Sequence, residues 1–147
     1  NYRPGYEVLG LQIAALNSDF VTNIYHLQKD GKPSFTLNDL FFDFDSYTIK
    51  NSFEQYLLLL VDQINQNKEI EVEINGHTDN KGKEEYNQAL SLKRANAIKL
   101  FLESNGVTNH IVTYGFGDSQ PAFPNTTDEN RSKNRRVEIF FKPTMNN

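Results

Sequence analysis

Two charged residues in the middle of the chain, Arg94 and Asp79, are the ones whose types and spacing point to chemistry. Between residues 86 and 102, every fourth position is apolar except one. These positions are Tyr86, Leu90, Arg94, Ile98 and Leu102. Such a row is the buried face of an amphipathic helix, so Arg94 stands among core residues. A guanidinium keeps its charge, and burying it without an anion costs several kcal/mol. We expect Asp79, in the polar loop before the helix, to supply that anion.

This pair supports two interpretations, and periodicity does not choose between them. In the first, the role is structural: Arg94 is tied to Asp79, or its charged end reaches past the helix edge to water. In the second, the two side chains are held apart as a cation and an anion for one ligand that carries both a carboxylate and an ammonium group. An arginine fork suits the carboxylate, and an aspartate accepts hydrogen bonds from an amine.

A strand, a loop and a long helix must position these two side chains. Residues 69–74 alternate acidic with apolar side chains, which predicts a half-buried strand. Residues 75–82 follow as a polar loop that begins and ends near glycines. Two acids in the first turn and the Asn105-Gly106 stop predict a helix from about 83–85 to 105.

The helices and strands on either side are predicted from the same helical and strand spacings of apolar residues. A first strand over 35–45 would place Leu40, Phe42 and Phe44 on one face. The other elements are a helix over 51–66, a strand over 110–114, a long loop over 115–133 with one helical turn at 128–132, and a strand over 135–142. The order β-α-β-α-β-β predicts an α+β fold with two helices packed on one face of a mixed sheet.

Residues 1–34 are predicted to form an N-terminal extension. Two β-prone runs, 9–13 and 20–27, flank turn residues at 17–19, which is typical of a hairpin, and 29–33 has the composition of a linker or tight turn. The hairpin either packs on the domain as extra strands or belongs to the end of a preceding domain. The domain itself is expected over 35–142, with 143–147 as a tail.

Composition limits the classes of function. With 147 residues, 37% of them hydrophobic, the chain suits one well-packed domain. Its longest apolar run is far shorter than the roughly 20 residues that cross a bilayer, so we expect any signal peptide or membrane anchor to lie outside this sequence. A net charge of −4 argues against a nucleic-acid partner. The absence of cysteine removes thiol chemistry and disulfides.

His77 is the residue that would suggest a metal site or acid–base catalysis. The other histidines, His26 and His110, are far away in the sequence, and a His-x-Asp triplet alone is a weak signal. We therefore expect a loop or strand-edge histidine, no metal site and no cofactor.

The chain contains four short sequence motifs: GHTDNKG at 76–82, YNQALSLKRANAI at 86–98, GFGDSQP at 115–121 and NRRVEI at 134–139. In this order and spacing they resemble the OmpA-like, peptidoglycan-associated domain, and the resemblance covers roughly residues 35–142. It implies the same α+β architecture and a periplasmic domain that binds the peptide stem of peptidoglycan without cutting it. The ligand centre would be diaminopimelate, whose free end carries one amine and one carboxylate.

The resemblance assigns the two main ligand contacts to Asp79, in the TD-x-x-G loop, and to Arg94, in the L-S-x-x-R-A helix. It therefore favours the second interpretation of the charge pair. For Arg135, which needs an acidic partner from the sheet or the site, a structural role is favoured, and Asn87 is expected to tie the loop backbone. Secondary ligand candidates, each with a structural alternative, are Phe44, Asp45, Tyr47, Thr78, Asn87 and Arg135.

The implied function is a non-catalytic anchor that holds an outer-membrane or envelope protein to the cell wall, on the periplasmic face of a Gram-negative outer membrane. The expected partner is the peptide stem, lysine-type stems are expected to bind poorly, and homodimer formation is left open. One alternative is an envelope protein-interaction module in which the Asp79–Arg94 pair is structural. Another is a wall hydrolase using Asp79 with His77, for which the sequence offers no recognisable nucleophile or second placed carboxylate.

Overall fold

The computed structural model describes residues 11–13 and 35–143, and the strands of this part form one mixed sheet in the order β1-β2-β5-β3-β4. β1 (Leu11–Ile13) pairs antiparallel with β2 (Phe35–Asn38), which pairs antiparallel with β5 (Arg136–Pro143). β5 is also antiparallel to β3 (Ile70–His77), and β3 runs parallel to β4 (Ile111–Gly115). The last strand of the chain is therefore inserted between β2 and β3.

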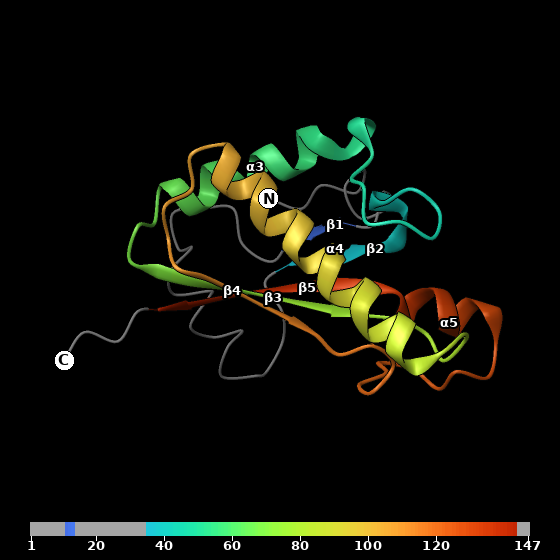
Figure 1. Cartoon of the computed structure of the whole chain (residues 1–147). Coiled ribbons are helices and arrows are strands. Elements are labelled where there is room, and N and C mark those ends of the chain that lie inside the picture. The colour runs from blue at the N-terminus through green and yellow to red at the C-terminus, as the bar shows by residue number, and fades with distance from the viewer. Residues whose placement is uncertain (1–10, 14–34, 144–147) are drawn as a thin grey trace.

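Two helices cover one face of this sheet (Figure 1). α3 (Glu54–Asn65) continues from a 3-10 turn at Asn51–Phe53, and α4 (Glu84–Ser104) connects the parallel strands β3 and β4. The predicted α+β fold, with two helices on one face of a mixed sheet, is confirmed. A third helix, α5 (Asp128–Asn134), extends the single turn predicted in the long loop. Within the described ranges, none of the helices combines the length and apolar character needed to cross a membrane.

The hydrophobic core lies between the sheet and these two helices. Strand residues in the core alternate along each strand, as predicted for β3 and β5, and are Phe35, Leu37, Ile70, Val72, Ile74, Val137, Ile139 and Phe141. Helix residues facing them include Leu57, Leu60, Ile64, Ile98 and Leu102. The resulting layer holds α4 firmly against the strand that leads into the Asp79 loop.

The N-terminal prediction is tested only in part. β1 falls within the first of the two predicted hairpin strands, and it pairs with β2. The second predicted strand, 20–27, and the linker at 29–33 lie outside the described residues.

The first strand of the domain is shorter than predicted. β2 ends at Asn38, whose side chain accepts a hydrogen bond from the Leu40 amide at 3.0 Å and caps a 3-10 turn, Asp39–Phe41. Phe42 is buried, whereas Leu40 is 50% and Phe44 97% exposed. The predicted common face of these three residues is therefore wrong, because strict alternation holds only while the backbone stays extended.

β3 is longer than predicted and touches α4 directly. It continues through Asn75, Gly76 and His77, all of which pair with β5. A Cβ atom added to Gly76 would lie 2.0 Å from the carbonyl oxygen of Ser91 in α4. Only a glycine permits this approach of two backbones. The contact sets the distance between the helix that carries Arg94 and the strand that leads to Asp79.

His77 is the last residue of β3, so it lies at the end of a strand and not in the loop that follows. Its side chain is 2% exposed, and its Nε2 is 3.4 Å from Glu138 on β5. Arg136 Nε donates a hydrogen bond to the same carboxylate at 2.8 Å. Burial raises the pKa of Glu138, but the contacts with His77 and Arg136 outweigh burial and leave the pKa below its ordinary value.

We predict that Gly76→Ala destabilises the protein by about 1–3 kcal/mol, because the new methyl group fits only if the α4 backbone moves away from β3. Thermal unfolding would show this as a lower Tm. Ala89→Ser, an exposed change on the same helix, is the control. An unchanged Tm in Gly76→Ala would contradict the close contact.

We also predict that Glu138 makes stability sensitive to acid. Because its pKa is lowered by folding, the stability it contributes is present above its ordinary pKa of 4.5 and is lost as pH falls through the lower folded value. Glu138→Gln should flatten this part of the curve of unfolding free energy against pH, measured by denaturant titration. Glu69→Gln, at an exposed position before β3, should leave the curve unchanged. The same acid-dependent loss in wild type and Glu138→Gln would contradict the assignment.

Candidate functional site

Asp79 lies in the loop directly after β3 and is only 7% exposed. Its Oδ2 accepts a hydrogen bond from Arg135 Nη1 at 2.7 Å, and its Oδ1 accepts one from the Lys81 amide at 2.9 Å. Beside it, the Thr78 amide donates to the Gly117 carbonyl at 2.8 Å, and the Thr78 hydroxyl donates to the Asp79 carbonyl at 2.9 Å. The Lys81 amide and the Arg135 side chain therefore hold the two oxygens of the carboxylate in place, and the Thr78 bonds fix the backbone beside it.

Arg94 lies on the buried face of α4, as predicted, and is 6% exposed. Its Nε donates a hydrogen bond to the Ser46 carbonyl at 2.8 Å, and its guanidinium carbon lies 4.8 Å from the centre of the Phe42 ring. Within residues 11–13 and 35–143, its terminal Nη groups have no hydrogen-bond or ion-pair partner. The predicted pairing of Arg94 with Asp79 is therefore wrong, because Asp79 is bonded to Arg135 instead.

Among the described residues, no carboxylate is in direct contact with the Arg94 guanidinium. Its charge is stabilised by carboxylates further away. Burial lowers its pKa, and the nearby carboxylates of Asp39 and Asp45 oppose that effect. Arg135 adds a second positive charge close by, which lowers the pKa further. An anion placed on the Nη groups would relieve both the burial and this repulsion.

Arg135 takes the position beside Asp79 that the sequence had suggested for Arg94. Its Nε donates to Asp39 Oδ2 and its Nη1 to Asp79 Oδ2, each at 2.7 Å. Burial lowers the pKa of Arg135, but these two bonds outweigh burial and raise the pKa above its ordinary value. The expectation that Arg135 finds an acidic partner is confirmed, and its partners are Asp79 of the candidate site and Asp39 of the 3-10 turn after β2.

Asn87 also does what was predicted of it. It is 6% exposed, and its Nδ2 donates to the Lys81 carbonyl at 2.7 Å, so it ties the Asp79 loop to α4. Tyr86, which was predicted on the buried row, is 49% exposed instead. A row of every fourth residue drifts by about 40° a step around a helix of 3.6 residues per turn, so Asn87 occupies the buried face in the first turn.

The loop after the 3-10 turn brings the other secondary candidates to the rim of the site. Asp45 adopts a positive φ of 51°, and its Oδ1 accepts a hydrogen bond from the Tyr86 hydroxyl at 2.6 Å. This bond raises the pKa of Tyr86. Phe44, at the tip of the loop, is 97% exposed, and Tyr47 is half exposed. The bond from Arg94 to Ser46 and the bond from Tyr86 to Asp45 thus fasten one loop to α4.

Asn134 orders the long loop before β5, and sequence reasoning missed it. Its side chain is fully buried, and its Oδ1 accepts hydrogen bonds from the amides of Ala122 at 2.9 Å and Phe123 at 3.0 Å. Its Nδ2 donates to the Phe123 carbonyl and to Asn125 Oδ1, both at 2.8 Å. The only feature of the sequence that pointed to Asn134 was its position directly before Arg135 in the motif NRRVEI.

The site can therefore hold a small ligand with two opposite charges. Among the described residues nothing is bonded to the Nη groups of Arg94, so they can meet an anion, and Asp79 presents a fixed carboxylate to a cation. Within the described part of the chain, no three His, Asp or Glu side chains are arranged to hold a metal ion.

Comparison with known proteins adds to this geometry. The chain is 34% identical over 106 residues to the peptidoglycan-associated lipoprotein of Buchnera aphidicola, a match that covers 71% of this chain and 61% of that protein. The chain thus spans less than two thirds of that relative. Its structure is similar to that of the peptidoglycan-associated lipoprotein from Burkholderia pseudomallei, with a TM-score of 0.65 and 26% identity over 76% of this chain and 92% of that one.

A second structural relative is the cell wall anchor of the T6SS from Pseudomonas aeruginosa, with a TM-score of 0.66 and 26% identity over 83% of this chain and 94% of that one. The family model described as the OmpA family matches residues 41–135. The match contains Asp79, Arg94 and Arg135. It also contains the loop after β3 and the loop after the 3-10 turn. This chain therefore belongs to the OmpA family.

Proposed function

We propose that this domain binds peptidoglycan without cutting it and anchors an envelope protein to the cell wall. Support comes from membership of the OmpA family and from similarity to proteins named as peptidoglycan-associated and as a cell wall anchor. The observation that carries the proposal is the buried guanidinium of Arg94, whose Nη groups have no partner among the described residues. A protein keeps such a charge where a ligand can pair with it.

The ligand group that fits this site is the free end of diaminopimelate in the peptide stem. Its carboxylate would accept two parallel hydrogen bonds from the Nη groups of Arg94. Its ammonium would donate to Asp79, which already accepts from Arg135 and Lys81 but still has unused lone pairs, because a carboxylate offers about four. A lysine-type stem lacks the distal carboxylate and would leave Arg94 unpaired.

The strength of these contacts suits a reversible tether. A hydrogen bond to a charged group contributes about 1.5–3 kcal/mol where water is largely excluded. Two such contacts give selective binding that still releases, and many domains acting on one wall would hold it by multivalency. We take residues 35–142 as the wall-binding unit and the periplasmic side of the outer membrane as its place, with any dimer as a further property of the whole protein.

One observation favours a second candidate function, a protein-interaction module of the envelope. Asp79 is already ion-paired with Arg135 at 2.7 Å, so its role could be to hold the loop in shape. The same pair also fixes the carboxylate for a ligand, and stability and binding measurements separate the two roles.

We predict that Arg94→Ala and Asp79→Ala each weaken binding to diaminopimelate-containing wall by roughly 10- to 150-fold, the loss of one charge-assisted contact. Sedimentation of the protein with purified wall sacculi would measure this. Arg94→Ala should unfold at the same denaturant concentration as wild type or higher, because an unpaired buried charge is removed. Asp79→Ala should lose little stability, because Arg135 keeps its bond to Asp39.

Arg131→Ala is the matched arginine control, since its carboxylate partner Asp128 is 97% exposed and lies on α5. It should bind wall as wild type does. Unchanged wall binding in both site variants, with clear destabilisation in both, would favour the protein-interaction module.

Replacement of Arg94 by lysine tests whether the geometry of the guanidinium matters. We predict that Arg94→Lys binds wall nearly as poorly as Arg94→Ala, because an ammonium cannot form the bidentate fork or hold the Ser46 carbonyl at the same time. Sedimentation with sacculi at several salt concentrations would show it. Wild-type binding in Arg94→Lys would mean that charge alone suffices.

A further inference from the structure

β4 is the last strand in the order of the sheet, so its backbone has a neighbour on one side only. The Val72 amide of β3 donates to the His110 carbonyl at 2.9 Å, which shows which residues of this strand face β3. Because the direction of the backbone groups alternates along a strand, the even-numbered residues turn to β3, and Ile111 and Thr113 turn to the free edge. Among the described residues, no hydrogen bond engages the N–H and C=O groups of these two residues.

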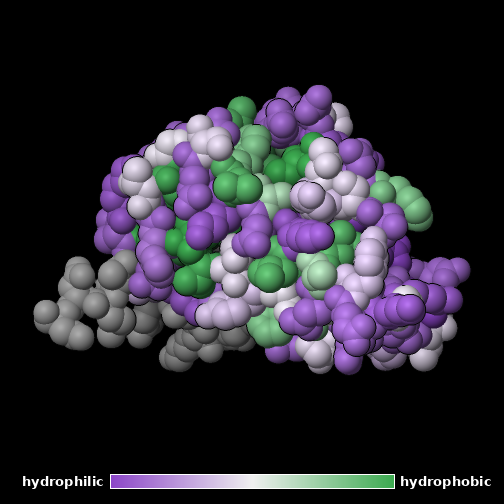
Figure 2. All heavy atoms as spheres, viewed as in Figure 1, coloured by the Kyte–Doolittle hydropathy of each residue, from purple (hydrophilic) through white to green (hydrophobic). Residues whose placement is uncertain are grey.

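This edge lacks the features that usually keep an edge strand from pairing. Charged side chains, proline and bulges are the common ones. β4 reads Ile-Val-Thr-Tyr-Gly, without a charge or a proline, and its register with β3 is continuous. The internal strands β3 and β5 do carry several charged residues. Figure 2, in the view of Figure 1, shows green and pale side chains along the band where β4 runs.

The free groups of β4 are complementary to those of a second copy. Gly115 also turns its carbonyl to the edge, but this oxygen already accepts a hydrogen bond from Gln88 of α4. The groups that remain belong to Ile111 and Thr113. If two copies run antiparallel about Val112, Ile111 of each copy exchanges both backbone bonds with Thr113 of the other. This register uses all the remaining groups and leaves the Gln88 bond in place.

The side chains on the outer face of the sheet match in the same register. Val112 would lie directly opposite Val112 of the second copy, in the closely spaced kind of cross-strand pair, which suits β-branched residues. Tyr114, which is 47% exposed, would lie opposite His110, which is also exposed. The pairing would therefore cover exposed side chains on both copies without placing two acids or two bases opposite each other.

The helices leave room for this pairing. A Cβ atom added to Gly76 would lie 2.0 Å from the Ser91 carbonyl oxygen, and one added to Gly115 would lie 2.6 Å from the Leu92 amide nitrogen, so α4 lies over both β3 and β4. The two copies of α4 would then be about two strand spacings apart, roughly 10 Å, which is close to the distance between packed helices. Leu92, 39% exposed, would be covered between them.

We propose that two copies of this domain join edge to edge through β4, so that their sheets form one continuous sheet around a twofold axis at Val112. Such an interface is isologous, because each copy contributes the same surface. The proposal does not rest on the proposed function, since the Asp79 loop follows β3 and its partner Arg135 directly precedes β5, away from the paired edge. Antiparallel pairing would leave the two candidate sites open at opposite ends of the joined sheet.

Analytical ultracentrifugation tests this proposal. We expect a dimer that forms between about 10 µM and about 1 mM protein, because an interface made by one short strand belongs to the small, weak class. Thr113→Pro should raise the dissociation constant at least about tenfold, since it removes two of the four backbone bonds between the copies. The fold should tolerate this proline, because the Thr113 N–H is not used by β3.

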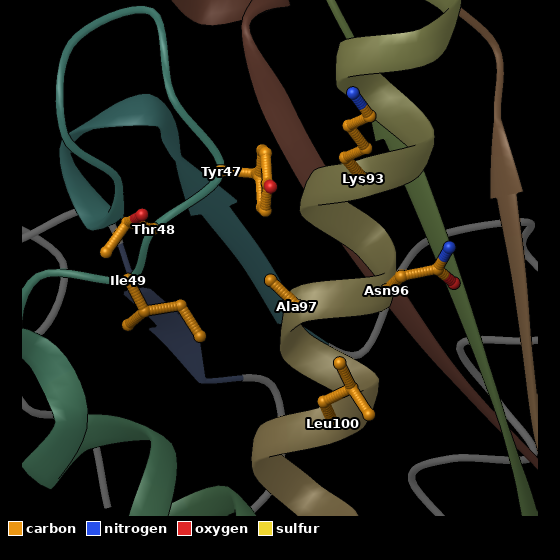
Figure 3. Close-up of a pocket in the computed structure, with 7 residues that line it drawn as sticks. All are labelled: Tyr47, Thr48, Ile49, Lys93, Asn96, Ala97 and Leu100. Atoms are coloured by element: carbon orange, nitrogen blue, oxygen red, sulfur yellow. The ribbon is translucent and has the colours of Figure 1, made fainter.

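Thr113→Val is the matched control. The Thr113 hydroxyl donates to Asn96 Oδ1 at 2.7 Å, and Figure 3 shows Asn96 projecting from α4 on the side opposite Tyr47. Both substitutions remove this bond, but only proline removes the backbone donor. Thr113→Val should therefore dimerise as wild type does.

A second variant keeps the test valid if Thr113→Pro fails to fold. Val112→Lys would place two ammonium groups next to each other at the twofold axis and should prevent the dimer, whereas Val112→Thr, which stays uncharged, should not. Amide hydrogen exchange gives an independent measurement. The Ile111 and Thr113 amides should exchange more slowly as protein concentration rises, and the Val112 amide, which faces β3, should not change.

Three results would overturn the proposal. The first is a monomer at every concentration, and the second is a dimer that persists in both Thr113→Pro and Val112→Lys, which would place the interface elsewhere. The third is protection of the Ile111 and Thr113 amides that does not depend on concentration, because another segment would then already cover the edge. Wall binding by the monomeric variants measures the proposed function separately.

Discussion

The buried positive charge of Arg94 is the constraint on which the rest of the site depends. Its Nε is used by the Ser46 carbonyl, and its flat face lies on Phe42, so the guanidinium is fixed in direction before any ligand arrives. The carboxylates of Asp39 and Asp45 stabilise the charge from a distance. The described residues place no carboxylate on its Nη groups, and these groups are therefore the ones to which we assign the proposed ligand contact.

The second arginine makes this arrangement clear by contrast. Arg135 is bonded to two carboxylates, Asp39 at the end of β2 and Asp79 after β3, and so joins two loops that are far apart in the sequence. Asn134, next to it, orders the long loop before β5. Arg135 thus uses its charge to join these two segments, whereas the charge of Arg94 meets no carboxylate among the described residues. The Gly76–Ser91 contact brings α4 close enough for both to act in one place.

Much of the fold was predictable because the relevant signals are local and periodic. Alternation marked β3 and β5, and the acidic first turn and Gly106 placed α4 within a residue of its bounds. The predictions fail where a single local hydrogen bond or a long-range contact determines the backbone conformation or the partner of a side chain. The Asn38 side chain starts a 3-10 turn that shifts the faces of Phe42 and Phe44, a change that a period cannot reveal. Helix drift explains the exposure of Tyr86.

The structure brings several of the predicted site residues together, but it pairs them differently from the prediction. Asp79 and Arg94 do lie at one end of the sheet with Thr78 and Asn87, yet Asp79 is bonded to Arg135, 56 residues further along the chain. Sequence proximity had favoured Arg94 as the partner, and only the order of strands, with β5 beside β3, brings Arg135 there.

Calorimetric titration of this protein with two soluble stem peptides, identical except for diaminopimelate or lysine at the third position, tests the central claim most directly. The account predicts saturable binding of the diaminopimelate peptide and little or none of the lysine peptide, because only the former carries a carboxylate for Arg94. Equal binding of the two peptides, or no heat with either from a folded sample, would contradict it.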